Sequence, residues 1–150
     1  MKKVYLLCNA HIDPVWQWDI AEGKSVAVST FAAVADLLDE YDFVFCHNES
    51  VLYEWVEEYE PELFERIKKH IQNGKWKVMG GWYLQPDCNI PTAESIIRHV
   101  LVGREYFKRK FGIPENTVAI NLDAFGHSSG LPLLLNKLGY TGYIGHRPMK

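Results

Sequence analysis

Short runs of β-branched and aromatic residues alternate along the chain with longer segments in which apolar residues recur at helical spacing. The short runs predict strands at residues 3–8, 42–46, 75–79, 118–122 and 140–144. Strands that alternate with helices in this way are typical of βα units and a parallel sheet. The pattern therefore predicts an α/β fold.

The intervening segments predict helices, because their apolar residues return every three or four positions. These helices are expected at residues 26–38, 52–59, 61–71, 92–111 and 131–138. Thr92 is a suitable N-cap for the fourth helix, and Pro61 suits the first turn of the third. Gly74 and Gly112 stand where a glycine commonly ends a helix.

Five strands and their crossover helices would form an open sheet or a little over half of a barrel. The sequence shows no internal repeat, linker or low-complexity stretch. It stops just after the fifth predicted strand, without a helix to cover that strand. We therefore expect residues 1–150 to be a fragment of a larger domain.

Composition and charge narrow the range of functions. The chain has 150 residues and 47% of them are apolar, so one sizeable core is expected without disulfides. The formal net charge is −3 and neither sign gathers into a block, which argues against a nucleic-acid partner. No apolar run approaches the roughly 18 residues of a membrane span. Three widely spaced cysteines favour a reducing compartment, so we expect a soluble, cytoplasmic protein with no membrane partner.

Polar side chains follow the predicted strands, at the strand ends where parallel α/β folds place their sites. His11 and Asp13 come after the first strand, and Asp123 comes after the fourth. One imidazole and two carboxylates would leave coordination positions open for a substrate, which is the form of a catalytic metal site. Each pattern alone also suits a capping or turn role. Their joint position at strand ends favours the metal site.

Two tryptophans also follow strand ends, beside polar residues. These are Trp16 and Trp82. An aromatic face in such a position suits the apolar C–H surface of a sugar ring. The sequence therefore indicates a carbohydrate as one class of ligand.

Five segments in this order resemble a known family. They are HIDPVW at 11–16, GGWYLQPDCN at 80–89, ESIIRH at 94–99, NLDAFGHS at 121–128 and the final GHRPMK. Together they resemble the N-terminal catalytic region of the class II α-mannosidases, glycoside hydrolase family 38. The resemblance implies a retaining, metal-dependent hydrolase that releases terminal α-linked mannose from oligosaccharides or glycoconjugates. It also implies a partial (β/α)7-type barrel with parallel strands, of which residues 1–150 would be the N-terminal portion.

The resemblance assigns the metal site by position in these motifs. His11 and Asp13 are implied as metal ligands, and Asp123 is implied as both ligand and nucleophile. The metal is normally zinc in this family. The same donor types would also accept cobalt, manganese or calcium, so the identity of the metal is open.

The resemblance also assigns residues around the sugar. Trp16 matches the aromatic platform under the mannose ring, and Arg147 matches an arginine near the nucleophile. Phe125 and Asp87 are implied as pocket residues, and His127 is implied in the surrounding shell. The substrate partner would be an α-mannoside oligosaccharide.

Some parts of the family's pattern are missing. The fourth metal ligand, a histidine, and the acid/base carboxylate would follow residue 150, so we expect the isolated chain to be inactive or nearly so. Relatives often have Glu where Gln85 stands. An uncovered sheet edge would favour self-association, which makes a homo-oligomer an open alternative.

Two other classes of function stay open. A metal-dependent carbohydrate deacetylase also gathers Asp and His at strand ends, and it would use an activated water in place of a carboxylate nucleophile. A non-catalytic sugar-binding module could use Trp16, Trp82 and Tyr83 without a metal. The role of Asp123 separates these alternatives from the hydrolase.

Overall fold

The computed structural model describes residues 2–115 and 117–146, and the chain divides into two compact units. The first unit comprises residues 1–47 and 52–77, and the second comprises residues 48–51 and 78–150. Strands β1 (Phe45–Glu49) and β2 (Trp76–Trp82) form a two-stranded sheet. Strands β3 (Val118–Asn121) and β4 (Gly142–Gly145) form another. The fold is thus mixed α/β, and the predicted partial barrel stays a prediction.

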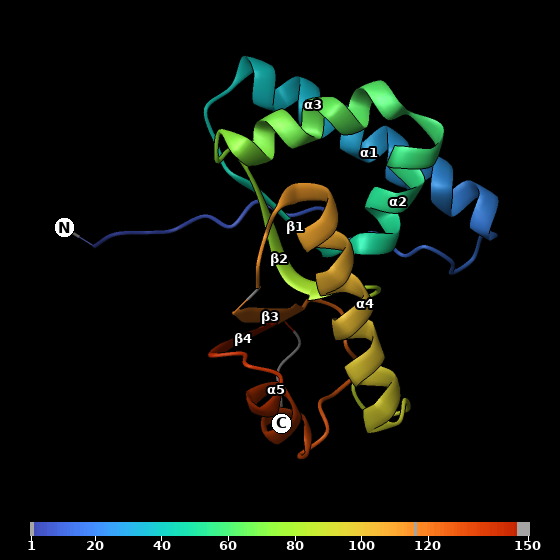
Figure 1. The fold of residues 1–150 in the computed structure, drawn as a ribbon, viewed down its shortest axis with the longest axis vertical. Helices are drawn as coiled ribbons and strands as arrows, with labels where there is room; N and C mark the ends of the chain where they lie inside the picture. The colour runs from blue at the N-terminus through green and yellow to red at the C-terminus, as the bar shows by residue number, and fades with distance from the viewer. Residues whose placement is uncertain (1, 116, 147–150) are drawn as a thin grey trace. The chain divides into compact units, whose positions relative to one another are not determined.

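Two helices of the first unit, α1 (Ile20–Glu40) and α3 (Pro61–Gln72), pack alongside each other (Figure 1). Helix α1 begins six residues before the predicted start at Val26, because Asp19 caps it. The Asp19 carboxylate accepts hydrogen bonds from the backbone N–H groups of Ala21 and Glu22, at 2.9 and 3.0 Å. Helix α3 begins at Pro61 as predicted.

Aromatic residues form the core of the first unit. Phe31 of α1 makes edge contacts with Trp76 and Tyr53, at centroid distances of 5.1 and 5.0 Å. The Trp76 indole N–H donates to the Tyr53 hydroxyl at 2.8 Å, so its polar atom is satisfied inside the core. Tyr53 belongs to α2 (Ser50–Tyr59), which this core holds against α1.

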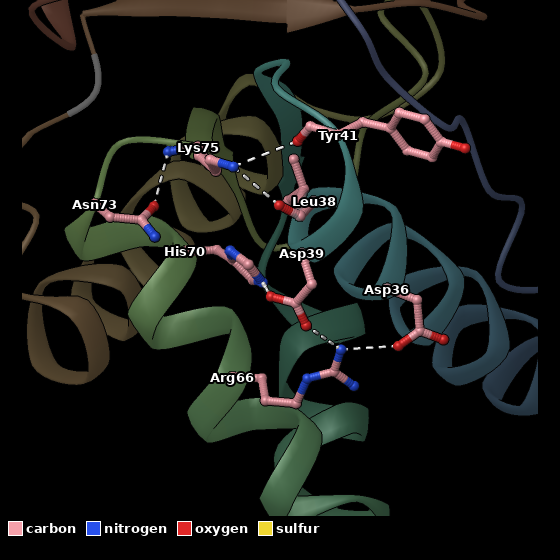
Figure 2. A network of polar contacts seen from close by, with 8 residues as sticks. All are labelled: Asp36, Leu38, Asp39, Tyr41, Arg66, His70, Asn73 and Lys75. Carbon is pink, nitrogen blue, oxygen red and sulfur yellow. Dashed lines mark hydrogen bonds and ion pairs between the residues drawn. The ribbon is translucent and has the colours of Figure 1, made fainter.

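Charged side chains link the exposed faces of α1 and α3 (Figure 2). Arg66 donates to Asp36 at 2.8 Å and to Asp39 at 2.7 Å. His70 Nε2 lies 3.2 Å from the other oxygen of Asp39. The hydrogen bond from Arg66 lowers the pKa of Asp39. His70 is buried, but Asp36, Asp39 and Arg66 are exposed to solvent, so the ion pairs of Arg66 contribute little to stability.

Lys75 completes this network at the end of α1 (Figure 2). Its ammonium group donates to the carbonyl oxygens of Leu38 and Tyr41, at 3.1 and 3.3 Å. The last carbonyls of a helix have no partner within the helix, and a lysine satisfies them favourably.

The first predicted strand, residues 3–8, is wrong. Cys8 alone forms a bridge, with Phe45 of β1, and Val4, Tyr5 and Leu6 are more than four-fifths exposed. A strand requires a neighbour that accepts and donates its backbone hydrogen bonds. In the described part of the chain this segment has such a neighbour only at Cys8, so its β-prone composition does not produce a strand.

The second unit contains α4 (Ala93–Phe111), α5 (Leu131–Lys137) and the sheet of β3 and β4. Thr92 caps α4 as predicted, and Gly112 ends it with a φ of 68°. Strands β3 and β4 are parallel, with Val118 opposite Gly142 and Asn121 opposite Gly145. The shared core of this unit contains Trp82, Cys88, Ile96, Val100, Ala119, Ala124, Leu131, Leu135 and Tyr140.

Helix α4 approaches β2 closely at a glycine. A Cβ atom added at Gly103 would overlap the carbonyl oxygen of Gly81 and the backbone of Trp82. Gly103 therefore allows a helix and a strand end to pack backbone against backbone.

No helix in the described residues is both long and apolar enough to cross a membrane.

We expect Gly103→Ala to destabilise the protein by about 1–3 kcal/mol, because the new methyl group must displace backbone atoms. This loss outweighs the roughly 1 kcal/mol by which alanine improves a helix over glycine. Denaturant unfolding measures the change. The neighbouring exposed position gives the control, since Val102→Ala should stay within about 0.5 kcal/mol. A stabilised Gly103→Ala variant would contradict the close approach.

We expect the effect of Asp39→Asn on stability to depend on pH. The folded protein lowers the pKa of Asp39, so this carboxylate stabilises the fold above its unfolded pKa of about 4. The stabilisation is lost as the pH falls through the folded pKa. Urea unfolding should therefore show a deficit for Asp39→Asn at pH 7 that disappears in acid and shrinks in high salt. A deficit that is equal at all pH values would exclude the ion pair as its cause.

Candidate functional site

His11 and Asp13 lie in an extended segment that follows Cys8. His11 Nε2 is 3.3 Å from Asp13 Oδ1, and both side chains are accessible to solvent. Ile12 between them is buried, so the alternation of an extended backbone turns the two polar side chains away from the core. An imidazole nitrogen and a carboxylate oxygen thus face the same space.

The segment is also fixed after Asp13. The Trp18 indole N–H donates to the backbone carbonyl of Asp13 at 3.1 Å. The backbone of Pro14 packs directly onto Gly23 of α1, where any Cβ would overlap the Pro14 carbonyl. These two contacts hold the loop that links the His11–Asp13 pair to α1.

Trp16 lies in the same loop and is 67% exposed. Its ring and the Trp18 ring are nearly perpendicular, with centroids 5.5 Å apart and an interplanar angle of 87°. This contact orients one side of the Trp16 ring and leaves a broad aromatic surface open to solvent. Such a surface can pack on an apolar face of a ligand.

Asp123 follows β3 in the second unit and is partly buried. The strand end before it is held by side-chain hydrogen bonds. Gln85 Oε1 accepts from the backbone N–H of Leu122 at 2.9 Å. The Asn121 amide donates to the Pro86 carbonyl at 2.8 Å and to the Cys88 sulfur at 3.1 Å. The segment 85–88 therefore fixes the backbone that carries Asp123.

Gln85 is itself held by a buried carboxylate. Its backbone N–H donates to Glu49 Oε1 at 3.0 Å, and Glu49 is 1% exposed. Sequence analysis missed the roles of Gln85 and Asn121. The only sequence signal was their place inside the two motifs that carry the family resemblance.

Asp87 has a local structural task. Its Oδ1 atom accepts from the backbone N–H groups of Asn89 and Ile90, at 2.7 and 2.9 Å. These bonds close a turn and lower the pKa of Asp87, so the group is ionised at neutral pH. One carboxylate oxygen therefore serves the turn, and the pocket role of Asp87 stays a prediction.

Phe125 and His127 follow Asp123 in the same loop. Phe125 is 74% exposed. His127 Nδ1 lies 2.8 Å from the Tyr143 hydroxyl, and the Cys88–His127 bridge ties its backbone to segment 85–88. Burial raises the pKa of Tyr143, so its phenol stays protonated and orients the imidazole.

Trp82 is not available as a sugar platform, contrary to the sequence-based expectation. It is 1% exposed, and its indole N–H donates to the Ile120 carbonyl at 2.7 Å. Its ring stacks near Tyr140 in the core of the second unit. A tryptophan that satisfies its N–H on a buried strand has no free face for a ligand.

The predicted site residues are thus divided between the units. His11, Asp13 and Trp16 belong to the first, and Asp123 and its neighbours belong to the second. That one metal ion joins His11, Asp13 and Asp123 stays a prediction. Arg147 lies outside the described residues.

The chain is similar to known carbohydrate-active proteins. Alpha-mannosidase G of Dictyostelium discoideum is 32% identical over 143 residues, which are 95% of this chain and 13% of the relative. The alpha-mannosidase of Saccharomyces cerevisiae is 29% identical over 146 residues, again with 13% of its length covered. This chain therefore spans about an eighth of these relatives.

Solved structures show a similar fold. A crystal structure of an alpha-mannosidase from Enterococcus faecalis V583 matches with a TM-score of 0.84 at 23% identity, over 96% of this chain and 16% of that one. A 4-alpha-glucanotransferase from Thermococcus litoralis matches with a TM-score of 0.68 at 16% identity, over 91% of this chain and 21% of that one. At these identities the likeness concerns the fold alone.

The model of the family described as "Glycosyl hydrolases family 38 N-terminal domain" matches residues 1–148. This match covers nearly every residue that carries the motifs and the strand ends described above. The chain therefore belongs to glycosyl hydrolase family 38.

Proposed function

We propose that this chain is the N-terminal part of the catalytic domain of a retaining, metal-dependent α-mannosidase. The family match over residues 1–148 carries the proposal, and relatives named alpha-mannosidase support it. The substrate class is terminal α-linked mannose in oligosaccharides or glycoconjugates. Because the chain spans about an eighth of those relatives, the activity is proposed for the full-length enzyme and not for residues 1–150 alone.

The donor atoms of the first unit fit a divalent metal. Two ligands that are each about 2.1 Å from a tetrahedral zinc ion lie about 3.4 Å apart. His11 Nε2 and Asp13 Oδ1 are 3.3 Å apart, which matches this spacing. We propose that these two atoms and the Asp123 carboxylate bind zinc, or cobalt, manganese or calcium in its place. When bound, the metal would supply electrostatic stabilisation and an anchor for sugar hydroxyls.

Asp123 is the proposed nucleophile. Its carboxylate attacks the anomeric carbon, the bond to the leaving oxygen breaks, and a glycosyl ester forms. A second carboxyl group, about 5 Å from the nucleophile in retaining enzymes, protonates the leaving oxygen. That group then takes a proton from the water that hydrolyses the ester. We propose that it lies in the part of the enzyme outside this chain.

The aromatic side chains bind and orient the sugar in this proposal. Trp16 offers the broad exposed face that suits the C–H surface of a mannose ring. Phe125 is also exposed and lies in the same loop as the proposed nucleophile, two residues after it. Arg147, Asp87 and His127 are proposed to bind or orient groups around the nucleophile.

We expect Asp123→Asn in the full-length enzyme to lower kcat by at least about a thousandfold, because the amide cannot form the ester. A fluorinated glycoside that traps the intermediate should label the peptide that contains Asp123. Mass spectrometry detects the label, and the exposed Asp42→Asn gives the control with unchanged turnover. Turnover without any label on Asp123 would contradict the nucleophile and favour the deacetylase-like use of an activated water.

We expect Gln85→Met to lower kcat of the full-length enzyme about 10–100-fold with little change in KM. The loss of the acceptor leaves the partly buried N–H of Leu122 without this partner, at a cost of about 1–3 kcal/mol, and the position of Asp123 becomes less well fixed. Gln85→Glu keeps an acceptor at this position and should retain most of kcat. Equal losses in both variants would show that the hydrogen bond to Leu122 does not position the nucleophile.

A further inference from the structure

We infer that His47 is a positioning residue for the proposed metal-binding pair, because it fixes the backbone immediately before His11. The inference rests on the proposed function, since it assigns a task within the same site. His47 lies in β1 and is 0% exposed. Its Nε2 atom is 3.1 Å from the carbonyl oxygen of Ala10. A carbonyl oxygen only accepts, so the ring N–H donates in this bond.

The imidazole of His47 is itself held rigidly. Phe31 contacts it edge-on at a centroid distance of 5.0 Å, and Tyr53 contacts it edge-on at 6.0 Å. Phe45 stacks on it at 6.1 Å. A ring enclosed by three aromatic neighbours has little freedom to turn. The direction of its N–H is therefore set by the core of the first unit.

One backbone bond and two side-chain bonds link this segment to β1. The backbone N–H of Cys46 donates to the Cys8 carbonyl at 2.8 Å. The Asn9 amide then donates to the Cys46 carbonyl at 2.7 Å. One residue further, His47 donates to Ala10. Three consecutive residues are thus fastened to β1, and the next residue is His11.

His47 does more than fill space in the core, because its hydrogen bond to Ala10 fixes the backbone next to His11. The side chains of His11 and Asp13 are 28% and 41% exposed, so the core does not enclose them fully. Their relative placement therefore depends on the backbone on either side. His47 and Asn9 hold that backbone before the pair, and Trp18 holds it after the pair. Groups that hydrogen-bond directly to a metal ligand typically change metal affinity 10–100-fold when they are removed, and we expect the same range for His47, which acts through the residue before the ligand.

Two substitutions separate positioning from packing. His47→Phe keeps an aromatic ring of similar size and removes the donor. His47→Gln places an amide N–H close to the position of Nε2 and can restore the bond to Ala10. Phe31→Leu is the control, because it disturbs the same aromatic cluster and keeps the donor that His47→Phe removes.

The experiment uses the full-length enzyme, stripped of metal and titrated with zinc against a chromophoric chelator. We expect His47→Phe to weaken zinc binding 10–100-fold and to alter the visible absorption spectrum of the cobalt-loaded protein. We expect His47→Gln to recover zinc binding to within about threefold of the unsubstituted enzyme. Phe31→Leu should lower the melting temperature and weaken zinc binding less than His47→Phe does, because Phe45 and Tyr53 still hold the imidazole and its donor remains. If His47→Phe does not fold, His47→Met supplies a flexible side chain without a donor for the same comparison.

The outcomes distinguish this inference from the proposed function. Unchanged zinc affinity and an unchanged cobalt spectrum in folded His47→Phe would overturn the positioning role, while the unsubstituted enzyme still binds metal and cleaves mannosides. Equal losses in His47→Phe, His47→Gln and Phe31→Leu would assign His47 to packing and also overturn it. An unsubstituted enzyme that binds no metal and cleaves no mannoside would instead refute the proposed function.

Discussion

Hydrogen bonds from side chains to backbone hold the two segments on which the proposed site depends, the extended segment before His11 and the end of β3 before Asp123. Asn9 and His47 fasten the segment before His11, and Gln85 and Asn121 fasten the segment before Asp123. A regular sheet would satisfy such backbone groups along its ladder. At the end of a strand the ladder stops, and buried N–H and C=O groups need other partners. The side chains that supply them also fix where the proposed ligands lie.

Aromatic residues with a polar atom give each unit a rigid base for these bonds. Trp76 packs in the core of the first unit and satisfies its N–H on Tyr53, close to the ring of His47. Trp82 fills the core of the second unit and satisfies its N–H on the Ile120 carbonyl of β3. Large rings bury much apolar surface, and the single hydrogen bond selects one orientation. A rigid core of this kind fixes the ends of the short strands and so the positions of the loops that follow them.

Local sequence signals predicted the helices well, because their determinants lie within a few residues of one another. Thr92 caps α4 and Gly112 ends it, as the pattern indicated. Helix α1 begins earlier than its apolar pattern indicated, since the Asp19 cap does not appear in a count of apolar residues. The strand at residues 3–8 was wrong for a different reason. Its composition favours a strand, but a strand also requires a partner that is remote in sequence.

The sequence by itself determined the family, the helices and the chemical types of the proposed site, because motifs and caps depend on residue identity and short spacing. Only the tertiary structure decided which aromatic residue is accessible: Trp16 is exposed, whereas Trp82 has the same kind of sequence neighbourhood and is buried. It alone also revealed that His47 and Gln85 hold the backbone of remote segments. Exposure and long-range hydrogen bonds arise when the chain brings distant residues together, and no local pattern encodes them.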